Sequence, residues 1–373
     1  MGKGSYTGYR PTWAEVNLDN LGYNFRQIKK IIAPGTRIMG CVKADAYGHG
    51  LIPVARRLVA CGIDYLSVAS LDEAIELRHA HLRSPILVLG IILPADLAPL
   101  FKYGIIPTVC NKEMALALGR YARLKKKTIR IHVKVDTGMG RIGVLAREAV
   151  SFIRHTYALK GIDLEGIFTH LACADTDRNF TLRQIHSFNS VIKELDAAAI
   201  HIPLKHAANS LGIVDYPESR YNMVRPGLVM YGLKPQPRLN IALKPVLSLK
   251  TAVVYCKRVP KGYGISYGST YRTRKESTIV TLPIGYGDGY PRNLSNKAPV
   301  LIKGRRFRIS GRVCMDQIMV DIGDNGVKIG ETAVLIGVQG KNRITAEELA
   351  GLSNTIPYEI VCGLGSRVPR VYK

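Results

Sequence analysis

A regular alternation of short apolar runs with longer amphipathic runs, between about residues 36 and 230, constrains the fold of this chain more than any other feature. The amphipathic segments, such as Leu51–Ala60 and Ala146–Tyr157, have the length and period of helices. Strands that alternate with helices form a parallel sheet. The candidate strands are Arg37–Val42, Tyr65–Ala69, Ile86–Leu89, Ile105–Val109, Ile129–Val135, Gly166–His170, Pro203–Ala207 and Asn222–Arg225.

Eight such units fit a (β/α)8 TIM barrel, although periodicity alone leaves an open doubly wound sheet as the alternative. After about residue 240 the sequence changes to Val- and Ile-rich runs with turns between them. Only Thr345–Ser353 looks helical there, and Thr345 and Glu348 can form a capping box. We predict an α/β chain with a barrel domain over residues 1–240 and a smaller, mainly β domain over 241–373. The linker falls near Lys234–Pro237, and residues 1–12 are candidates for association with the second domain.

Composition narrows the cellular setting. With 47% apolar and 22% charged residues the chain reads as a folded protein, and no apolar run is long enough to span a bilayer. The seven cysteines are odd in number and too far apart for a zinc or redox pair, which suits reduced thiols. The polar start of the chain does not look like a secretory signal. We therefore expect a cytoplasmic protein without a metal site or a membrane partner.

The net charge of +25 favours anionic partners, and nucleic acid is the first to consider. The basic residues are scattered, however, with modest clusters at Arg123–Lys127 and Lys303–Arg308. No zinc-finger, basic-zipper or RNA-binding signature accompanies them. A solvated basic surface explains the charge better than a nucleic-acid partner.

Two glycine-containing segments compete as functional motifs. Gly138–Gly143 matches a dinucleotide fingerprint and Asp163 follows at the right distance, but the match comes after four earlier strand–helix units, where such a fingerprint is not expected. Lys43, in Val42–Gly50, is more informative because it ends the first predicted strand, at the barrel mouth where active sites lie. A lysine there can attack a carbonyl and form a Schiff base.

This lysine segment resembles the cofactor-binding motif of bacterial alanine racemases, which are barrel-type enzymes that use pyridoxal 5'-phosphate (PLP). The resemblance continues in order along the chain. The segments that carry it are Val42–Gly50, Lys134–Arg141, Phe168–His170, His206–Ser210, Asn222–Gly227, Ser266–Gly268, Gly285–Tyr290 and Cys314–Gln317. The resemblance implies a barrel, a β domain and a head-to-tail homodimer whose active sites use both chains.

The resemblance also implies a two-base racemisation of alanine. Lys43 holds the cofactor and, once released, acts as a base on one face of the substrate Cα, while Tyr267 of the partner chain acts on the other. His170 resembles the residue that contacts this tyrosine. Arg225 resembles the residue that faces the pyridine nitrogen, where a cation about 4 Å away costs a protonated nitrogen roughly 4 kcal/mol at an effective dielectric of about 20. An unprotonated ring favours racemisation over transamination.

The remaining site residues follow from the same resemblance. Tyr47, Ser210 and the amides of Gly227 and Leu228 are expected to contact the cofactor phosphate, and Asn209 is a further cofactor contact. Arg141 is expected to reach the cofactor's phenolic oxygen or the substrate carboxylate, and Met315 of the partner chain to contact the substrate. His206, Asp316 and Lys134 support these residues, and Lys134 is a candidate for carbamylation. A carbamate would turn Lys134 into an anion that orients Arg141.

One departure widens the possible substrates. Ser366 stands where the family usually has a tyrosine that contacts the phosphate and narrows the entrance. Serine or a broader range of amino acids is therefore an alternative to alanine. A barrel-type decarboxylase would share Lys43 but lack Tyr267 and Arg225, and a non-catalytic PLP-binding protein would need neither Tyr267 nor the β domain. Supply of D-alanine for peptidoglycan is the physiological role that the resemblance implies.

Overall fold

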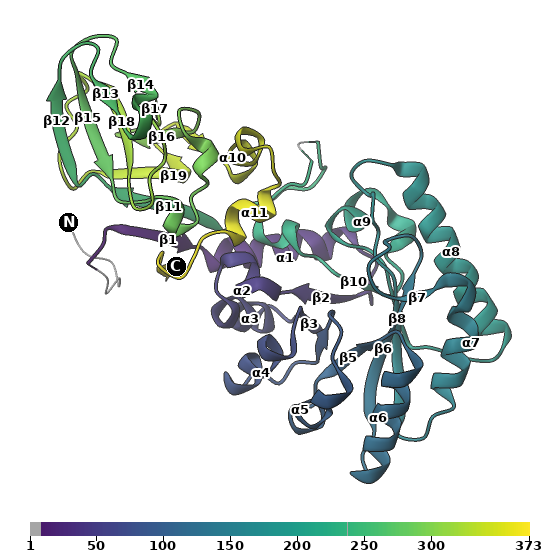
Figure 1. Cartoon of the computed structure of the whole chain (residues 1–373). Helices are drawn as coiled ribbons and strands as arrows, with labels where there is room; N and C mark the ends of the chain where they lie inside the picture. The colour runs from purple at the N-terminus through teal and green to yellow at the C-terminus, as the bar shows by residue number, and fades with distance from the viewer. Residues whose placement is uncertain (1–8, 237) are drawn as a thin grey trace.

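The computed structural model describes residues 9–236 and 238–373, which form a barrel and a β domain (Figure 1). Eight parallel strands close into a ring because β5 pairs with β6 and β10 pairs with β2. Each predicted strand overlaps one of them, so the barrel prediction is confirmed and the open sheet is not. The ring strands are β2 (Arg37–Cys41), β3 (Tyr65–Val68), β4 (Ile86–Val88), β5 (Ile106–Val109), β6 (Ile129–Asp136), β8 (Ile162–Phe168), β9 (Leu204–His206) and β10 (Met223–Val224).

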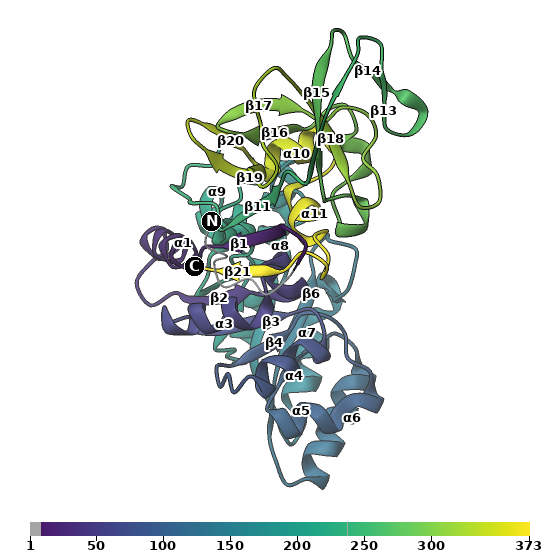
Figure 2. The same ribbon diagram turned by 90° about the vertical axis from the view of Figure 1, so that its left-hand side faces the viewer.

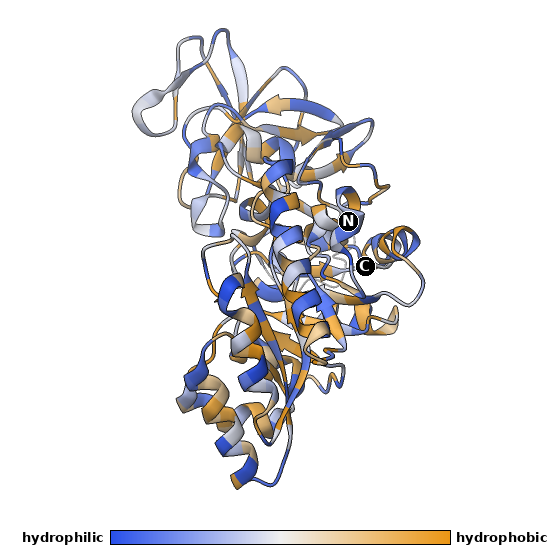
Figure 3. Cartoon of the chain, turned by 90° about the vertical axis from the view of Figure 1, so that its right-hand side faces the viewer, coloured by the Kyte–Doolittle hydropathy of each residue, from blue (hydrophilic) through white to orange (hydrophobic). Residues whose placement is uncertain are grey.

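Helices surround the ring, and apolar residues are concentrated in the strands and on the inner sides of the helices (Figure 3). Helix α8 begins at Arg178, because Asp177 caps it by accepting a hydrogen bond from the Phe180 amide (2.8 Å). The outer helices are α1 (Leu18–Ile31), α3 (Leu51–Ala60), α4 (Leu71–His79), α5 (Leu97–Tyr103), α6 (Lys112–Leu124), α7 (Ala146–Tyr157) and α8 (Arg178–Ala197). Among the described residues, no helix combines the length and the hydropathy that crossing a membrane requires.

The β domain contains a mixed sheet with the order β17-β16-β19-β11-β1-β21, a three-stranded sheet β12-β15-β18 and the hairpin β13-β14. A short strand, β20, pairs antiparallel with β19, and β7 (Val144–Leu145) pairs with β6 of the barrel. The strands of the domain are β11 (Leu247–Ala252), β12 (Tyr255–Val259), β13 (Gly264–Ile265), β14 (Tyr271–Arg272), β15 (Ser277–Leu282), β16 (Pro299–Ile302), β17 (Arg305–Arg308), β18 (Ile318–Gly323), β19 (Thr332–Gln339), β20 (Asn342–Ile344) and β21 (Arg370–Tyr372).

The first strand of the chain, β1 (Thr12–Val16), lies in this second domain. It pairs antiparallel with β11 and parallel with β21, so an early segment joins two late ones (Figure 2). A buried Thr12 hydroxyl bonds to Thr251 (2.8 Å), and Glu15 pairs with Lys250 (2.8 Å). Of the residues 1–12 proposed for this association, residues 1–8 lie outside the described part of the chain.

Two details of the β domain differ from prediction. Thr345 does cap α10 (Ala346–Ser353) by accepting from the Glu348 amide (3.1 Å), but the Glu348 carboxylate pairs with Arg306 and does not complete a capping box. A second helix, α11 (Pro357–Cys362), is also present, although only one was expected. It has six residues and starts with proline, which is too short for a helical period to be visible in the sequence.

Candidate active site

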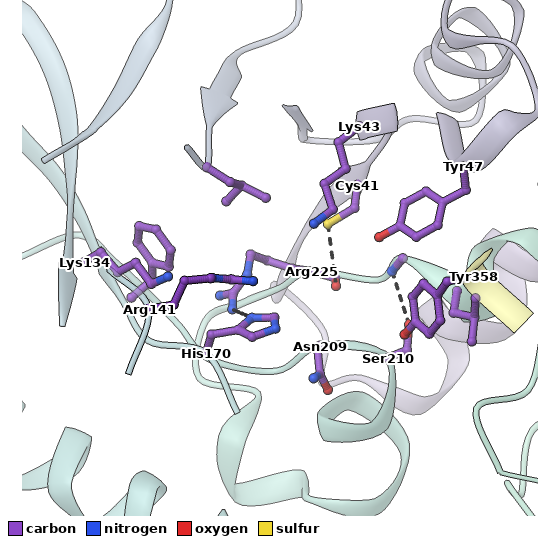
Figure 4. A pocket seen from close by; sticks show the side chains of 14 residues that line it. Cys41, Lys43, Tyr47, Lys134, Arg141, His170, Asn209, Ser210, Arg225 and Tyr358 are labelled. Carbon is purple, nitrogen blue, oxygen red and sulfur yellow. Dashed lines mark hydrogen bonds between the residues drawn. The ribbon is translucent and has the colours of Figure 1, made fainter. Parts of the chain in front are cut away.

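A cavity with about 690 Å³ of empty space, part of it open to solvent, lies at the C-terminal ends of the barrel strands (Figure 4). The residues that line it come from the loops and strand ends after β2, β4, β6, β8, β9 and β10, and from α11. They are Cys41, Lys43, Tyr47, Leu89, Lys134, Arg141, Phe168, His170, Asn209, Ser210, Arg225, Gly227, Leu228 and Tyr358.

The cavity brings together every residue of the barrel that the sequence nominated for cofactor binding. Four of its lining side chains are cations, namely Lys43, Lys134, Arg141 and Arg225, and none is a carboxylate. A cavity with this charge balance favours an anionic ligand over a neutral or cationic one.

Lys43 is followed by an unusual left-handed turn within α2 (Lys43–Gly48). The φ angles of the four residues after it, Ala44 to Tyr47, lie between 52° and 56°. Such a conformation costs an L-residue roughly 1–2 kcal/mol each. Hydrogen bonds offset this cost: the Ala44 amide donates to Glu73 (2.6 Å), and the Leu51 amide donates to the side chain of Asp45 (2.7 Å). The turn directs both Lys43 and Tyr47 toward the cavity (Figure 4).

At the Tyr47 end, the backbone comes unusually close to a side chain. A Cβ atom at Gly227 would lie only 2.5 Å from the Tyr47 hydroxyl, so this position needs glycine. The Ser210 hydroxyl accepts hydrogen bonds from the amides of Gly227 (3.2 Å) and Val229 (3.3 Å). Hydroxyl groups and amides that converge in a cationic cavity fit a phosphate group, as PLP requires.

Arg225 lies at the other end and is 3% exposed. Its Nη2 donates to the carbonyls of Thr169 (2.7 Å) and Ala207 (3.0 Å), and its Nη1 donates to His206 Nδ1 (2.7 Å). The Phe168 ring packs against the guanidinium, with 5.3 Å between its centroid and Cζ. These contacts hold the guanidinium in one orientation, beside the cavity.

Burial and neighbouring cations change the protonation of two other residues. Burial, with Arg141 and Arg225 nearby, lowers the pKa of Lys134 to about 8. Burial and then Arg225 lower the pKa of His170 well below its usual value, so this imidazole is neutral at pH 7. At pH 7 roughly a tenth of the Lys134 side chains are therefore neutral amines, far more than for an ordinary lysine.

Three predicted residues lie elsewhere. Tyr267, Met315 and Asp316 surround a separate hollow of the β domain, where the Tyr267 side chain is 70% exposed and Met315 53%. The hairpin β13-β14, next to Tyr267, lies at the end of the β domain far from the barrel in both views (Figures 1 and 2).

The structure also adds residues that the sequence did not nominate. Tyr358, from the unpredicted α11, lines the cavity with its ring centroid 5.9 Å from that of Tyr47, whereas Ser366 is not among the lining residues. Cys41, Leu89 and Phe168 also line it. In the sequence, Cys41 and Leu89 are among the last two residues of predicted strands, and Phe168 belongs to a predicted strand and to a motif segment, but none had been assigned a role.

The glycine-rich segment after β6 has a local role. The Asp136 carboxylate accepts hydrogen bonds from the amides of Gly138 (2.9 Å), Met139 (2.8 Å) and Gly140 (3.0 Å). These amides are the groups that a dinucleotide fingerprint would offer to a pyrophosphate. The structure therefore agrees with the rejection of a dinucleotide site.

The barrel, the β domain and the lysine in a cationic cavity define a two-domain α/β protein with a candidate anion-binding site at the barrel mouth. Residues 16–235 match the model of the alanine racemase N-terminal domain, and residues 246–372 match that of the C-terminal domain. The chain therefore belongs to the alanine racemase family, whose members depend on PLP.

Individual relatives agree over nearly the whole length. The chain is 52% identical to an alanine racemase of Halothermothrix orenii over 98% of this chain and 97% of that protein, and 47% identical to one of Carboxydothermus hydrogenoformans over 97% and 100%. A structure of alanine racemase from Clostridium difficile 630 superposes with a TM-score of 0.92 at 41% identity, covering 98% of this chain and 97% of that one. The Bacillus anthracis enzyme with bound L-Ala-P gives 0.91 at 38%, covering 99% and 96%.

These relatives settle the activity at the level of the family, which is the interconversion of L-alanine and D-alanine. None of the relatives described above is a serine racemase, a decarboxylase or a non-catalytic protein, so those alternatives are not favoured.

Proposed function

We propose that this chain racemises alanine with two bases on opposite faces of the substrate, Lys43 and the partner subunit's Tyr267. The observation that carries the proposal is the cavity itself, in which an amine just after β2 shares the lining with the guanidinium groups of Arg141 and Arg225 and with no Asp or Glu side chain. Such a site binds a phosphorylated aldehyde and an amino-acid carboxylate together.

We assign the PLP contacts as follows. Lys43 bonds covalently to the aldehyde; Tyr47, Ser210 and the amides near Gly227 hold the phosphate; Arg225 faces the ring nitrogen. When bound, PLP supplies an electron-withdrawing ring that weakens the Cα–H bond of an attached amino acid. Because Arg225 only donates hydrogen bonds, it meets an unprotonated nitrogen and limits that withdrawal.

Proton transfer at Cα is the work of the two bases. With a substrate in place, the Lys43 amine removes or returns a proton on one face, and the Tyr267 oxygen does so on the other. His170 is neutral, and its Nδ1 accepts from Arg225 Nη2 (3.4 Å), so its remaining proton is on Nε2. From there His170 can donate a hydrogen bond to the oxygen of that tyrosine and stabilise it after it gives up its proton. Arg141 holds the substrate carboxylate.

The position of Tyr267 supports a homodimer. The side chain is exposed and belongs to the end of the β domain far from the cavity, so one chain alone does not bring it to Lys43. A head-to-tail pair of chains would bury Tyr267 and Met315 in the partner's cavity and make two equal sites.

Mixing two inactive variants tests this arrangement. Lys43→Ala and Tyr267→Ala chains, unfolded and refolded together in equal amounts, should regain about a quarter of the wild-type activity, because half the dimers are mixed and each mixed dimer holds one intact site. A mixture no more active than its separate components would contradict the shared site. Full activity of Lys43→Ala alone would contradict the proposed function.

We also propose that Lys134 carries a carbamate, because its lowered pKa leaves neutral amine to react with carbon dioxide and an anion would relieve the repulsion from Arg141. Carbon-13 NMR of enzyme in labelled bicarbonate should show a carbamate signal that Lys134→Gln removes. A spectrum without it would refute the modification.

We place the enzyme in the cytoplasm, where it supplies D-alanine to the cell wall. All seven cysteines are free in the structure, which suits a reducing compartment. Cell fractionation with a D-alanine auxotrophy test of a deletion strain would check both statements.

A further inference from the structure

A continuous chain of hydrogen bonds runs through the barrel interior, away from the cavity. Arg225 Nη1 lies 2.7 Å from His206 Nδ1, His206 Nε2 lies 2.8 Å from His132 Nδ1, and His132 Nε2 lies 3.1 Å from Glu165 Oε2. The second carboxylate oxygen of Glu165 accepts from Tyr65 and from Arg130, both at 2.9 Å. Side chains of five barrel strands or strand ends thus connect the cavity to the partly exposed Arg130.

The fold makes specific room for this chain. A Cβ atom at Gly166 would lie 2.6 Å from the His132 ring, so only glycine lets that imidazole take its position. The Phe168 ring stacks on His206 with 4.8 Å between centroids and 4° between planes. Both imidazoles are fully buried.

The hydrogen-bond chain allows only one placement of the imidazole protons. A guanidinium only donates, so His206 Nδ1 accepts and its proton sits on Nε2. That proton is donated to His132 Nδ1, which leaves the His132 proton on Nε2, where it meets the carboxylate. The Arg225 cation at one end and the Glu165 anion at the other therefore fix the tautomers of His206 and His132 between them.

The charges agree with this arrangement. Burial lowers the pKa of both His132 and His206, so both imidazoles are neutral. Burial opposes ionisation of Glu165, but hydrogen bonding to His132 and the charge of Arg130 outweigh it and lower its pKa to about 2. Among the described residues, no carboxylate contacts Arg225 directly, so Glu165 balances this buried cation through two neutral rings.

We propose that Glu165 and His132 are positioning residues for racemisation, which act by fixing the tautomer of His206 and through it the orientation of Arg225. This rests on the proposed role of Arg225 opposite the cofactor ring. If the His206 proton moved to Nδ1, two N–H groups would face each other, and Arg225 would have to leave its position.

Nitrogen-15 NMR tests the proton arrangement directly. In histidine-labelled holoenzyme, long-range proton–nitrogen spectra should show His132 and His206 as neutral Nε2–H tautomers, assigned by their loss in His132→Asn and His206→Asn. An Nδ1–H tautomer or an imidazolium at either residue would overturn the proposal. The measurement needs no turnover, so it is independent of whether Lys43 and Tyr267 are the two bases.

Kinetics of two Glu165 variants then test the function. Glu165→Leu removes the acceptor for His132 and should lower kcat about tenfold, with KM little changed and with more transamination per turnover. Glu165→Gln keeps an acceptor oxygen without the charge and should fall between this variant and the wild type.

The matched control is Glu15→Leu, which removes another ion-paired, largely buried glutamate that does not line the cavity. It should lower Tm without changing the ratio of transamination to racemisation. Wild-type kcat and partitioning in Glu165→Leu would overturn the proposal; if that variant fails to fold, the tautomers of the wild-type enzyme and the kinetics of Glu165→Gln decide. Full activity of Lys43→Ala would instead refute the two-base function and leave the tautomer result intact.

Discussion

The barrel mouth and the outer face of the β domain surround the two proposed bases in different ways. Lys43 precedes a turn in which the Ala44 amide donates to the Glu73 carboxylate, and it faces a guanidinium held by hydrogen bonds to two carbonyls and to His206. Tyr267 is 70% exposed, and Met315 nearby is 53% exposed. The barrel half of the site is already organised within one chain, whereas the surroundings of Tyr267 have to come from a second copy.

The largest loss of activity should come from a change in the barrel half of the site, which is organised within one chain. Lys43→Ala should lower kcat/KM by about a thousandfold or more, because it removes both the covalent attachment and one base. Racemisation followed by circular dichroism measures this, and absorbance of the protein reports cofactor retention. Added methylamine should restore part of the rate if the loss is chemical, and a variant that keeps wild-type activity would break the assignment.

The open half should give the next largest effect, and a more selective one. Tyr267→Phe should lower racemisation about a hundredfold while leaving proton exchange on the Lys43 face. In deuterium oxide, one enantiomer of alanine should therefore exchange its Cα hydrogen without inversion. Equal loss of exchange for both enantiomers would argue against bases on opposite faces.

The third prediction compares the effects of Tyr358 and Ser366 on the choice between alanine and serine. Because Tyr358 lines the cavity and Ser366 does not, Tyr358→Ala should raise the ratio of kcat/KM for L-serine to that for L-alanine by about tenfold. Ser366→Tyr should change the ratio much less. The reverse order would indicate that residue 366 reaches the substrate once two chains are assembled.

A pH series tests how much the charge of Glu165, inside the barrel, contributes to the free energy of unfolding. Since Glu165 has a pKa of about 2 in the folded protein, below its ordinary 4.5, its ionised form contributes stability above pH 4.5 that is lost as pH falls toward 2. The free energy of unfolding of Glu165→Gln should thus lie below that of the wild type at pH 6, and the gap should close below pH 4.5. Urea unfolding at several pH values measures it, and a constant gap would be inconsistent with this pKa.

The smallest effect concerns the turn after Lys43. Ala44 is exposed at a φ of 54°, so Ala44→Gly should raise the free energy of unfolding by up to about 1 kcal/mol. The matched control is Ala117→Gly in the regular helix α6, which should lower it by about 1 kcal/mol. Thermal unfolding compares the two, and destabilisation by both would mean that the left-handed turn is not strained.

The alternation of strands and helices predicted the barrel, and the strand end predicted Lys43 at its mouth. The other residues of the mouth came from the resemblance of the motifs to those of the alanine racemases. The sequence did not predict α11, so Tyr358 was missed. Nor did it reveal the left-handed turn, which has alanine at two positions where glycine would be expected. Glu165 and His132 gave no signal either, because single polar residues inside a strand look the same whether they face solvent or a buried network.

The placement of β1 has a consequence for how the molecule is made. Thr12–Val16 leaves the ribosome early, but its neighbours in the sheet, β11 and β21, are synthesised after the whole barrel. Until then the nascent strand has unpaired edges that can associate with other chains. Cutting between the two domains would leave that strand without its sheet, so neither half is a natural unit for separate expression.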